Sequence, residues 1–200
     1  MKIIGLCGGS GSGKGTVAEK FSLFGIPSVD TDKVYHELTS KKSDCLEALV
    51  CEFGDSILSE DGSLNRRALS NLVFGDGVAA DRRQKLNFIT HKFVLERTRV
   101  ILKDFEEMGA KAAIVDAPLL FESGFDKECD LIIAVVADIN IRISRIMKRD
   151  GISEKSATLR VKTQLPDDYL SSRSDYVIKN NGSLDEVENA VVEIVNKLLY

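Results

Sequence analysis

The sequence predicts an α/β fold: a parallel five-stranded sheet with helices on both faces. Five short apolar runs separated by helical patterns predict the strands, at Ile3–Cys7, Ile26–Val29, Ala112–Val115, Leu131–Val136 and Tyr176–Ile178. Such alternation is typical of βαβ units. A glycine-rich segment, GGSGSGKGT, directly follows the first run. The chain has 200 residues, enough to bury a substantial core and to carry an insertion or two.

The first run and the glycine-rich segment form the pattern of a P-loop, the phosphate-binding loop of the P-loop NTPases. Its glycines, including Gly8 and Gly9, permit positive φ and let an anion approach the backbone. Backbone N–H groups and the helix dipole then attract phosphate, and Lys14 reaches the β- and γ-phosphates. The residues expected to bind a nucleoside triphosphate are Gly9, Gly11, Ser12, Gly13, Lys14, Gly15 and Thr16.

The helices that flank this core are predicted from apolar periodicity. The helix after the loop carries Val17, Phe21 and Phe24 on one face. The last helix has apolar residues at three–four spacing between residues 184 and 198. Ser183 precedes this helix and is a suitable N-cap.

Two regions depart from the alternation. From Thr31 to about Gly109 the pattern is helical, and residues 140–173 are polar and rich in arginine. Both follow the ends of predicted parallel strands, the edge where open α/β sheets bind ligands. We therefore expect residues 30–109 to be a helical substrate-binding insertion and residues 140–173 a mobile lid. The nucleotide-binding core then comprises residues 1–29, 110–139 and 174–200. The apolar stripe that ends the insertion consists of Leu86, Ile89, Phe93, Val100, Ile101, Phe105 and Met108.

Carboxylates end two of the predicted strands. Asp30 and Asp32 follow the second run, where a carboxylate could orient a hydroxyl nucleophile and take its proton. We favour Asp32 for this role, although either residue could instead cap the next helix. Asp116 ends the third run as a Walker-B-like carboxylate that could hold magnesium or its waters. A polar residue at a strand end is the alternative explanation.

Arginines recur at three–four spacing after the fourth predicted strand. Arg145 and Arg149 are favoured to neutralise charge on a transferring phosphoryl group, while the role of Arg142 stays open. A solvated basic face is the alternative. Arg160 is a further candidate.

Histidines and basic pairs elsewhere give weaker signals. His91 shares no motif with a serine or cysteine, which leaves a hydrolytic triad unsupported, and it is expected to be packed or to line a pocket. Arg66 and Arg67 could bind an anionic substrate group or be solvated.

Composition restricts the partners. A net charge of −4 argues against broad adhesion to nucleic acid or to anionic membranes. We expect no signal peptide, because the apolar run at residues 3–7 is too short and leads at once into the P-loop, and no apolar run is long enough to span a bilayer. The four cysteines have no metal-binding spacing. We expect a cytoplasmic protein with no nucleic-acid or membrane partner, either a monomer or a small homo-oligomer.

The chain resembles the dephospho-coenzyme A kinases nearly from end to end. Besides the P-loop, the family's segments occur in order: VDTD from Val29, FGDSILSEDGSLNRRALSNLVF from Phe53, VDAPLLFESG from Val115, IMKRDG from Ile146 and DYVIKNNGS from Asp175. This ordered set is highly specific. The resemblance implies transfer of the γ-phosphate of ATP, with Mg²⁺, to the ribose 3′-hydroxyl of dephospho-CoA, the last step of coenzyme A synthesis.

The resemblance also implies roles for particular residues. Lys14 would bind the phosphates and Asp32 would lie near the ribose hydroxyl. Arg145 or Arg149 would act from the lid, and Asn181 would lie near the adenine of ATP.

Gly15 departs from the family pattern, which usually has serine after the P-loop lysine. Thr16 is turned about 100° away on the helix and is expected to bind the α-phosphate instead of the metal. Magnesium should then have few or no direct side-chain ligands and be held through waters ordered by Asp32 and Asp116.

Two other classes of protein share the P-loop. The GKGT ending is also found in nucleoside-monophosphate kinases, from which the segments TDKVYHEL and DGSLNRRALS separate this chain. A GTP-dependent switch would need an Asn-Lys-x-Asp motif to read guanine, and the sequence has none.

Overall fold

The computed structural model describes residues 1–40, 42–74 and 79–199. Two compact units make up the chain. Met1–Asp30 and Leu102–Tyr200 form one, called here the sheet unit, and Thr31–Ile101 form the other, called the helical unit.

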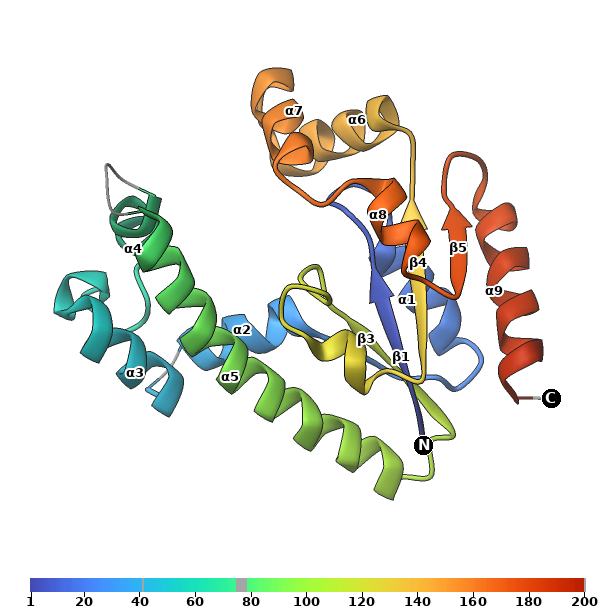
Figure 1. Ribbon diagram of the computed structural model, residues 1–200, viewed down its shortest axis with the longest axis horizontal. Helices are drawn as coiled ribbons and strands as arrows, with labels where there is room; N and C mark the ends of the chain where they lie inside the picture. The colour runs from blue at the N-terminus through green and yellow to red at the C-terminus, as the bar shows by residue number, and fades with distance from the viewer. Residues whose placement is uncertain (41, 75–78, 200) are drawn as a thin grey trace. The chain divides into compact units, whose positions relative to one another are not determined.

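The sheet unit contains five parallel strands in the order β2-β3-β1-β4-β5 (Figure 1). The strands are β1 (Lys2–Cys7), β2 (Ser28–Asp30), β3 (Ala112–Asp116), β4 (Leu131–Val136) and β5 (Tyr176–Lys179). The predicted α/β fold is therefore confirmed. The second strand is shorter than expected because Ile26 still belongs to the turn after the first helix, where its N–H bonds to Phe21 O.

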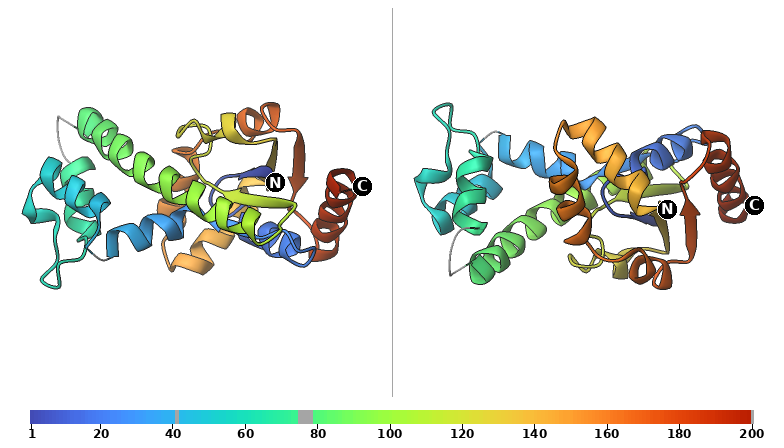
Figure 2. Two further views of the ribbon diagram at one scale, coloured as in Figure 1. Left: turned by 90° about the horizontal axis from the view of Figure 1, so that it is seen from below. Right: turned by 90° about the horizontal axis from the view of Figure 1, so that it is seen from above.

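Helices cover both faces of this sheet. Its helices are α1 (Lys14–Ser22), η2 (Phe125–Glu128), α6 (Ile139–Asp150), α7 (Glu154–Lys162), α8 (Asp167–Ser172) and α9 (Leu184–Leu199). Side chains alternate along a strand, so Ile4 and Leu6 pack with α1 and α9, which lie next to each other in Figure 2. Gly5 faces the opposite side, where Leu120 packs so closely that an added Cβ would clash with it.

The ends of the flanking helices show one correct and one wrong expectation. Ser183 Oγ accepts a hydrogen bond from Glu186 N at 3.3 Å, as an N-cap does. Phe24, however, does not share the buried face of Val17 and Phe21. It is 40% exposed, because α1 ends at Ser22 and the following turn carries Phe24 away from the helix face.

The helical unit has its own core. It contains α2 (Thr31–Ser40), α3 (Asp44–Phe53), η1 (Asp55–Ile57), α4 (Arg66–Phe74) and most of α5 (Ala79–Glu107). Ser43 caps α3 by accepting a hydrogen bond from Leu46 N at 3.1 Å. The fully or nearly fully buried core residues of this unit are Cys45, Leu46, Leu49, Ile57, Leu64, Leu69 and Val73.

The buried line along α5 differs from the expected stripe. It consists of Thr90, Val94, Thr98 and Leu102, each four residues from the last. Leu86, Ile89 and Phe93 pack beside the core, whereas Val100 and Met108 are exposed. Among the described residues, no helix combines the length and the apolarity that crossing a membrane requires.

Candidate active site

The chain passes from β1 into α1 through a glycine-rich loop, and two of its glycines have a left-handed backbone. The φ angle is +79° at Gly11 and +95° at Gly13. A Cβ on Gly13 would also lie 2.0 Å from Asn180 Nδ2. Glycine is needed at this position both for its backbone freedom and for its small size.

Gly9 and Gly15 differ from these two residues. Gly9 does not use the freedom to adopt positive φ. Gly9 is needed for space, because an added Cβ would lie 2.0 Å from Arg142 Nη2. Around Gly15, in the first turn of α1, an added Cβ meets no atom within 4 Å. A side chain would therefore fit at Gly15.

Lys14 folds back over the loop from the first turn of α1. Its Nζ donates a hydrogen bond to Gly8 O at 2.9 Å and lies 4.0 Å from Asp116 Oδ1. Asp116 ends β3, in register with Leu6 on β1 and with Asp30 on β2. The loop thus opens at the carboxyl edge of the sheet, with a lysine and two strand-end aspartates along it.

Three consecutive loop carbonyls are held from outside by side chains that are distant in the sequence. Ser10 O accepts from Arg142 Nε at 3.0 Å, and Gly11 O accepts from Arg145 Nη1 at 3.2 Å. Ser12 O accepts from Asn180 Nδ2 at 2.8 Å. In a planar trans peptide, C=O and N–H point in opposite directions. Holding these carbonyls outward therefore directs the N–H groups of Gly11 and Gly13 toward the other side of the loop, whereas the N–H of Ser12 donates within the loop to Gly9 O at 3.1 Å.

Arg145 has a second anchor in this arrangement. Its Nη2 donates to Asn180 Oδ1 at 3.3 Å, so Arg145 and Asn180 support each other as well as the loop. Asn180 is almost fully buried and also donates its backbone N–H to Val136 O at 2.8 Å. Sequence reasoning missed Asn180. The Asn180–Asn181 pair after the fifth strand was the available signal, but nothing in the spacing tells the two residues apart.

Asn181 occupies a different position. It exchanges two hydrogen bonds with Asp138, from Asp138 N to Asn181 Oδ1 at 2.8 Å and from Asn181 Nδ2 to Asp138 Oδ1 at 2.7 Å. These bonds join the turn after β4 to the turn after β5. Asn181 is exposed, unlike its neighbour.

Arg149 and Arg160 share one carboxylate at the rim of the loop. Arg149 Nε donates to Asp150 Oδ1 at 2.7 Å, and Arg160 Nη1 bonds to the other oxygen of Asp150. The hydrogen bond from Arg149 lowers the pKa of Asp150 to about 2, and the same bond raises the pKa of Arg149. One carboxylate between two guanidinium groups leaves the cluster with a net positive charge at neutral pH.

The helical unit holds the other candidates. Asp32 lies exposed in the first turn of α2, and Arg66 and Arg67 are exposed in the first turn of α4. His91 on α5 is half-buried, and its Nε2 has no hydrogen-bond partner in the described part of the chain. Burial lowers the pKa of His91.

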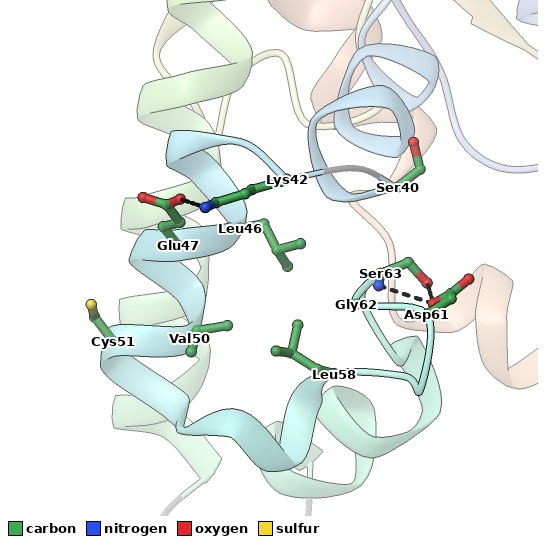
Figure 3. Close-up of a pocket in the computed structure, with 10 residues that line it drawn as sticks. All are labelled: Ser40, Lys42, Leu46, Glu47, Val50, Cys51, Leu58, Asp61, Gly62 and Ser63. Carbon is green, nitrogen blue, oxygen red and sulfur yellow. Dashed lines mark hydrogen bonds and ion pairs between the residues drawn. The ribbon is translucent and has the colours of Figure 1, made fainter.

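This unit also contains a pocket of about 600 Å³ (Figure 3). Leu46, Val50 and Leu58 give it an apolar wall, and Lys42 and Asp61 lie at its edges. Hydrogen bonds from Ser63 lower the pKa of Asp61. The pocket is apolar inside and polar at its mouth.

The strand order, the phosphate loop and the lysine that closes over it place the protein among the nucleotide-binding proteins of the P-loop fold. The family model for dephospho-CoA kinase matches residues 2–186. A dephospho-CoA kinase from Corynebacterium glutamicum is 38% identical over 198 residues, which cover 97% of this chain and 100% of the relative. The chain belongs to the dephospho-CoA kinase family, as the sequence motifs indicated.

Solved structures agree on the fold. The crystal structure of TT1252 from Thermus thermophilus has a TM-score of 0.82 and 30% sequence identity, and the match covers 100% of this chain and 98% of that one. A dephospho-CoA kinase from Campylobacter jejuni has a TM-score of 0.70 at 23% identity, with 98% and 97% of the two chains covered.

Proposed function

We propose that the protein transfers the γ-phosphoryl group of ATP to the ribose 3′-hydroxyl of dephospho-CoA and releases coenzyme A and ADP. Membership of the kinase family supports this reaction, and the outward-held carbonyls of Ser10, Gly11 and Ser12 are the observation that carries it. They leave the backbone N–H groups of Gly11 and Gly13 facing the bound phosphates, next to the N-terminus of α1. Gly9, Gly13 and Thr16 complete the nucleotide-binding loop.

The ribose 3′-oxygen attacks the γ-phosphorus while the bond from that phosphorus to the β–γ bridging oxygen breaks. Asp32 takes the proton of the hydroxyl group, and ADP leaves with the electron pair of the broken bond. Lys14 neutralises the β- and γ-phosphates. Arg149 stabilises the negative charge that spreads over the phosphoryl oxygens, and Arg145 takes the same role once its guanidinium group releases Gly11 O and Asn180 Oδ1. Asn181 lies beside the adenine.

Magnesium fits this site as an ion bound mainly by phosphate oxygens and water. Among the described residues there is no group of three or more His, Cys, Asp or Glu side chains that could hold a metal. Asp116 lies at the edge of the loop, and Gly15 offers no hydroxyl, so Asp116 and Asp32 would act by ordering metal-bound waters. When bound, Mg²⁺ would neutralise the negative charge of the phosphates.

The acceptor and the lid are assigned to separate regions of the chain. Residues 30–109 bind dephospho-CoA, and the apolar pocket of the helical unit supports this role because the acceptor has a long uncharged arm. Residues 140–173 close over the nucleotide and exclude water. The enzyme works in the cytoplasm as a monomer or a small homo-oligomer.

A product-resolved assay tests the reaction. ATP is incubated with magnesium and dephospho-CoA, AMP or no acceptor, and nucleotide and acceptor products are separated. ADP formation should depend strongly on dephospho-CoA and match coenzyme A formation one to one. Equal ATP hydrolysis without an acceptor, or faster phosphorylation of AMP, would show that the proposal is wrong. The AMP result would instead support a nucleoside-monophosphate kinase.

A further inference from the structure

Arg142 is the one charged residue in the described part of the chain that is almost fully buried, at 4% exposure. We propose that Arg142 is a positioning residue for nucleotide binding. It fixes the tip of the phosphate loop and, through Gln164 and Asp167, holds the α7–α8 connection against that tip. This inference rests on the proposed function only in taking ATP as the loop's ligand.

The guanidinium group of Arg142 binds three residues at once, one in the loop and two at the α7–α8 connection. Its Nε donates to Ser10 O at 3.0 Å, its Nη1 to Asp167 Oδ1 at 2.8 Å, and its Nη2 to Gln164 Oε1 at 3.0 Å. The fixed, planar fork of arginine allows this geometry, which a single ammonium group cannot reproduce.

Every polar group of Ser10 takes part in a hydrogen bond. Its N–H donates to Gln164 Oε1 at 2.8 Å, and its hydroxyl accepts from Arg149 Nη2 at 3.2 Å. With the bond from Arg142 to its carbonyl, both peptide groups of Ser10 are fixed by residues of the 140–173 segment. The loop tip therefore has little freedom to turn its peptide groups.

The glycines of the loop are fitted to Arg142. A Cβ on Gly9 would lie 2.0 Å from Arg142 Nη2, and a Cβ on Gly11 would lie 2.6 Å from Arg142 O. Gly9 thus leaves room for the side chain of Arg142, and Gly11 leaves room for its backbone. Packing and hydrogen bonding thus indicate the same role for Arg142.

Burial distinguishes Arg142 from Arg149. A buried guanidinium is costly unless it is fully paired, and Arg142 has a carboxylate and two further acceptors. Moving it toward a ligand would leave Asp167 and Gln164 without their bonds to Arg142. Arg149 is largely exposed and can move without that cost. Arg142 accordingly acts on the nucleotide through the loop and not by touching it.

Two variants test this contact, one at Arg142 and one at its acceptor Gln164. Arg142→Lys keeps a counter-ion for Asp167 but loses the threefold contact, and Gln164→Met removes the acceptor shared by Ser10 and Arg142. Each should raise the Kd and KM for ATP by ~10-fold, a loss of the size expected from one or two hydrogen bonds. The kcat and the KM for dephospho-CoA should change less than about twofold, because the loop binds ground and transition states alike. Lys127→Ala, which removes an exposed charge from η2 outside the 140–173 segment, is the control and should change none of these constants.

The double variant and the binding assay make the test decisive. Since both residues act through Ser10, the loss in Arg142→Lys/Gln164→Met should be clearly smaller than the product of the single losses. Unchanged ATP affinity in either folded variant, additive losses, or a fall in kcat at constant KM would each overturn the proposal. Calorimetric titration measures ATP binding without an acceptor. If the wild-type protein binds ATP but does not phosphorylate dephospho-CoA, the proposed function is wrong, and the effect of the variants on ATP affinity can still be measured.

Discussion

Asp32 is an exposed carboxylate in the first turn of α2. Asp32→Asn keeps the shape of the side chain but removes the proton acceptor. We expect turnover to fall by ~10²–10⁴, the range for lost general-base assistance, with ATP affinity nearly unchanged. Steady-state kinetics and ATP titration measure the two quantities. Asp44→Asn, which removes an exposed carboxylate from the first turn of α3, is the control and should keep full turnover.

If Asp32→Asn retained near-normal turnover, Asp32 would not be the general base and would only contribute to the N-terminal end of α2. The base would then have to be sought among the other carboxylates, beginning with Asp30, which ends β2 in register with Asp116.

Gly15 gives a second prediction at this scale. An added side chain meets no atom within 4 Å, so Gly15→Ser should fold normally. Its hydroxyl can reach the metal directly, and the magnesium concentration for half-maximal rate should fall several-fold. Gly15→Ala adds the same Cβ without a hydroxyl and should leave that concentration unchanged. A magnesium–ATP complex with Thr16 Oγ1 bound to the metal would contradict this description of the site.

Sequence reasoning identified the residues of the loop, but it did not show which residues support the loop from outside. Lys14 and the glycines were visible because a P-loop is a continuous pattern with its own chemistry. Asn180 and Gln164 act from far along the chain, and single amide residues carry no spacing signal. Arg142 was among the candidates, but its spacing with Arg145 and Arg149 could not show which guanidinium is buried.

At the scale of elements, α5 carries a pH-sensitive group. Burial lowers the pKa of His91 below its usual value of about 6.5, so the folded protein keeps it neutral where the unfolded chain binds a proton. The unfolded state therefore gains protons as the pH falls through about 6.5, and the free energy of unfolding decreases. We expect lower stability at pH 5.5 than at pH 7.5, as measured by urea unfolding.

Substitution identifies the histidine responsible. His91→Gln should flatten this pH dependence, whereas His36→Gln, at the exposed second histidine, should preserve it. An unchanged pH profile in His91→Gln would assign the effect to other groups.

The same helix shows what periodicity can and cannot predict. Apolar spacing correctly gave a long helix with a buried side, yet the buried line includes Thr90 and Thr98. Their hydroxyls donate to Leu86 O and Val94 O, both at 2.8 Å, so the threonines are buried without an unmet hydrogen bond. A search for apolar residues does not pick out threonines. The expected stripe therefore left out Thr90 and Thr98 and included the exposed residues Val100 and Met108.

At the scale of the whole molecule, the proposed roles of the two units can be separated by hydrogen exchange. ATP should slow exchange of amides in residues 8–16, and dephospho-CoA should slow exchange in residues 31–101, because bound ligands stabilise the regions that they contact. Mass spectrometry of peptide fragments resolves these segments. Protection by dephospho-CoA that is confined to the sheet unit would mean that the helical unit does not bind the acceptor.

The residues that hold the phosphate loop from outside also determine when the loop can fold. The loop lies near the start of the chain, but the bonds that shape it join residues 132, 154 and 168 positions apart. Closing such long segments is entropically costly and comes late in folding. During synthesis, a nascent chain that ends before Arg142 contains the whole loop without any of these outer supports. The loop thus acquires its working geometry only after the chain has been made as far as Asn180.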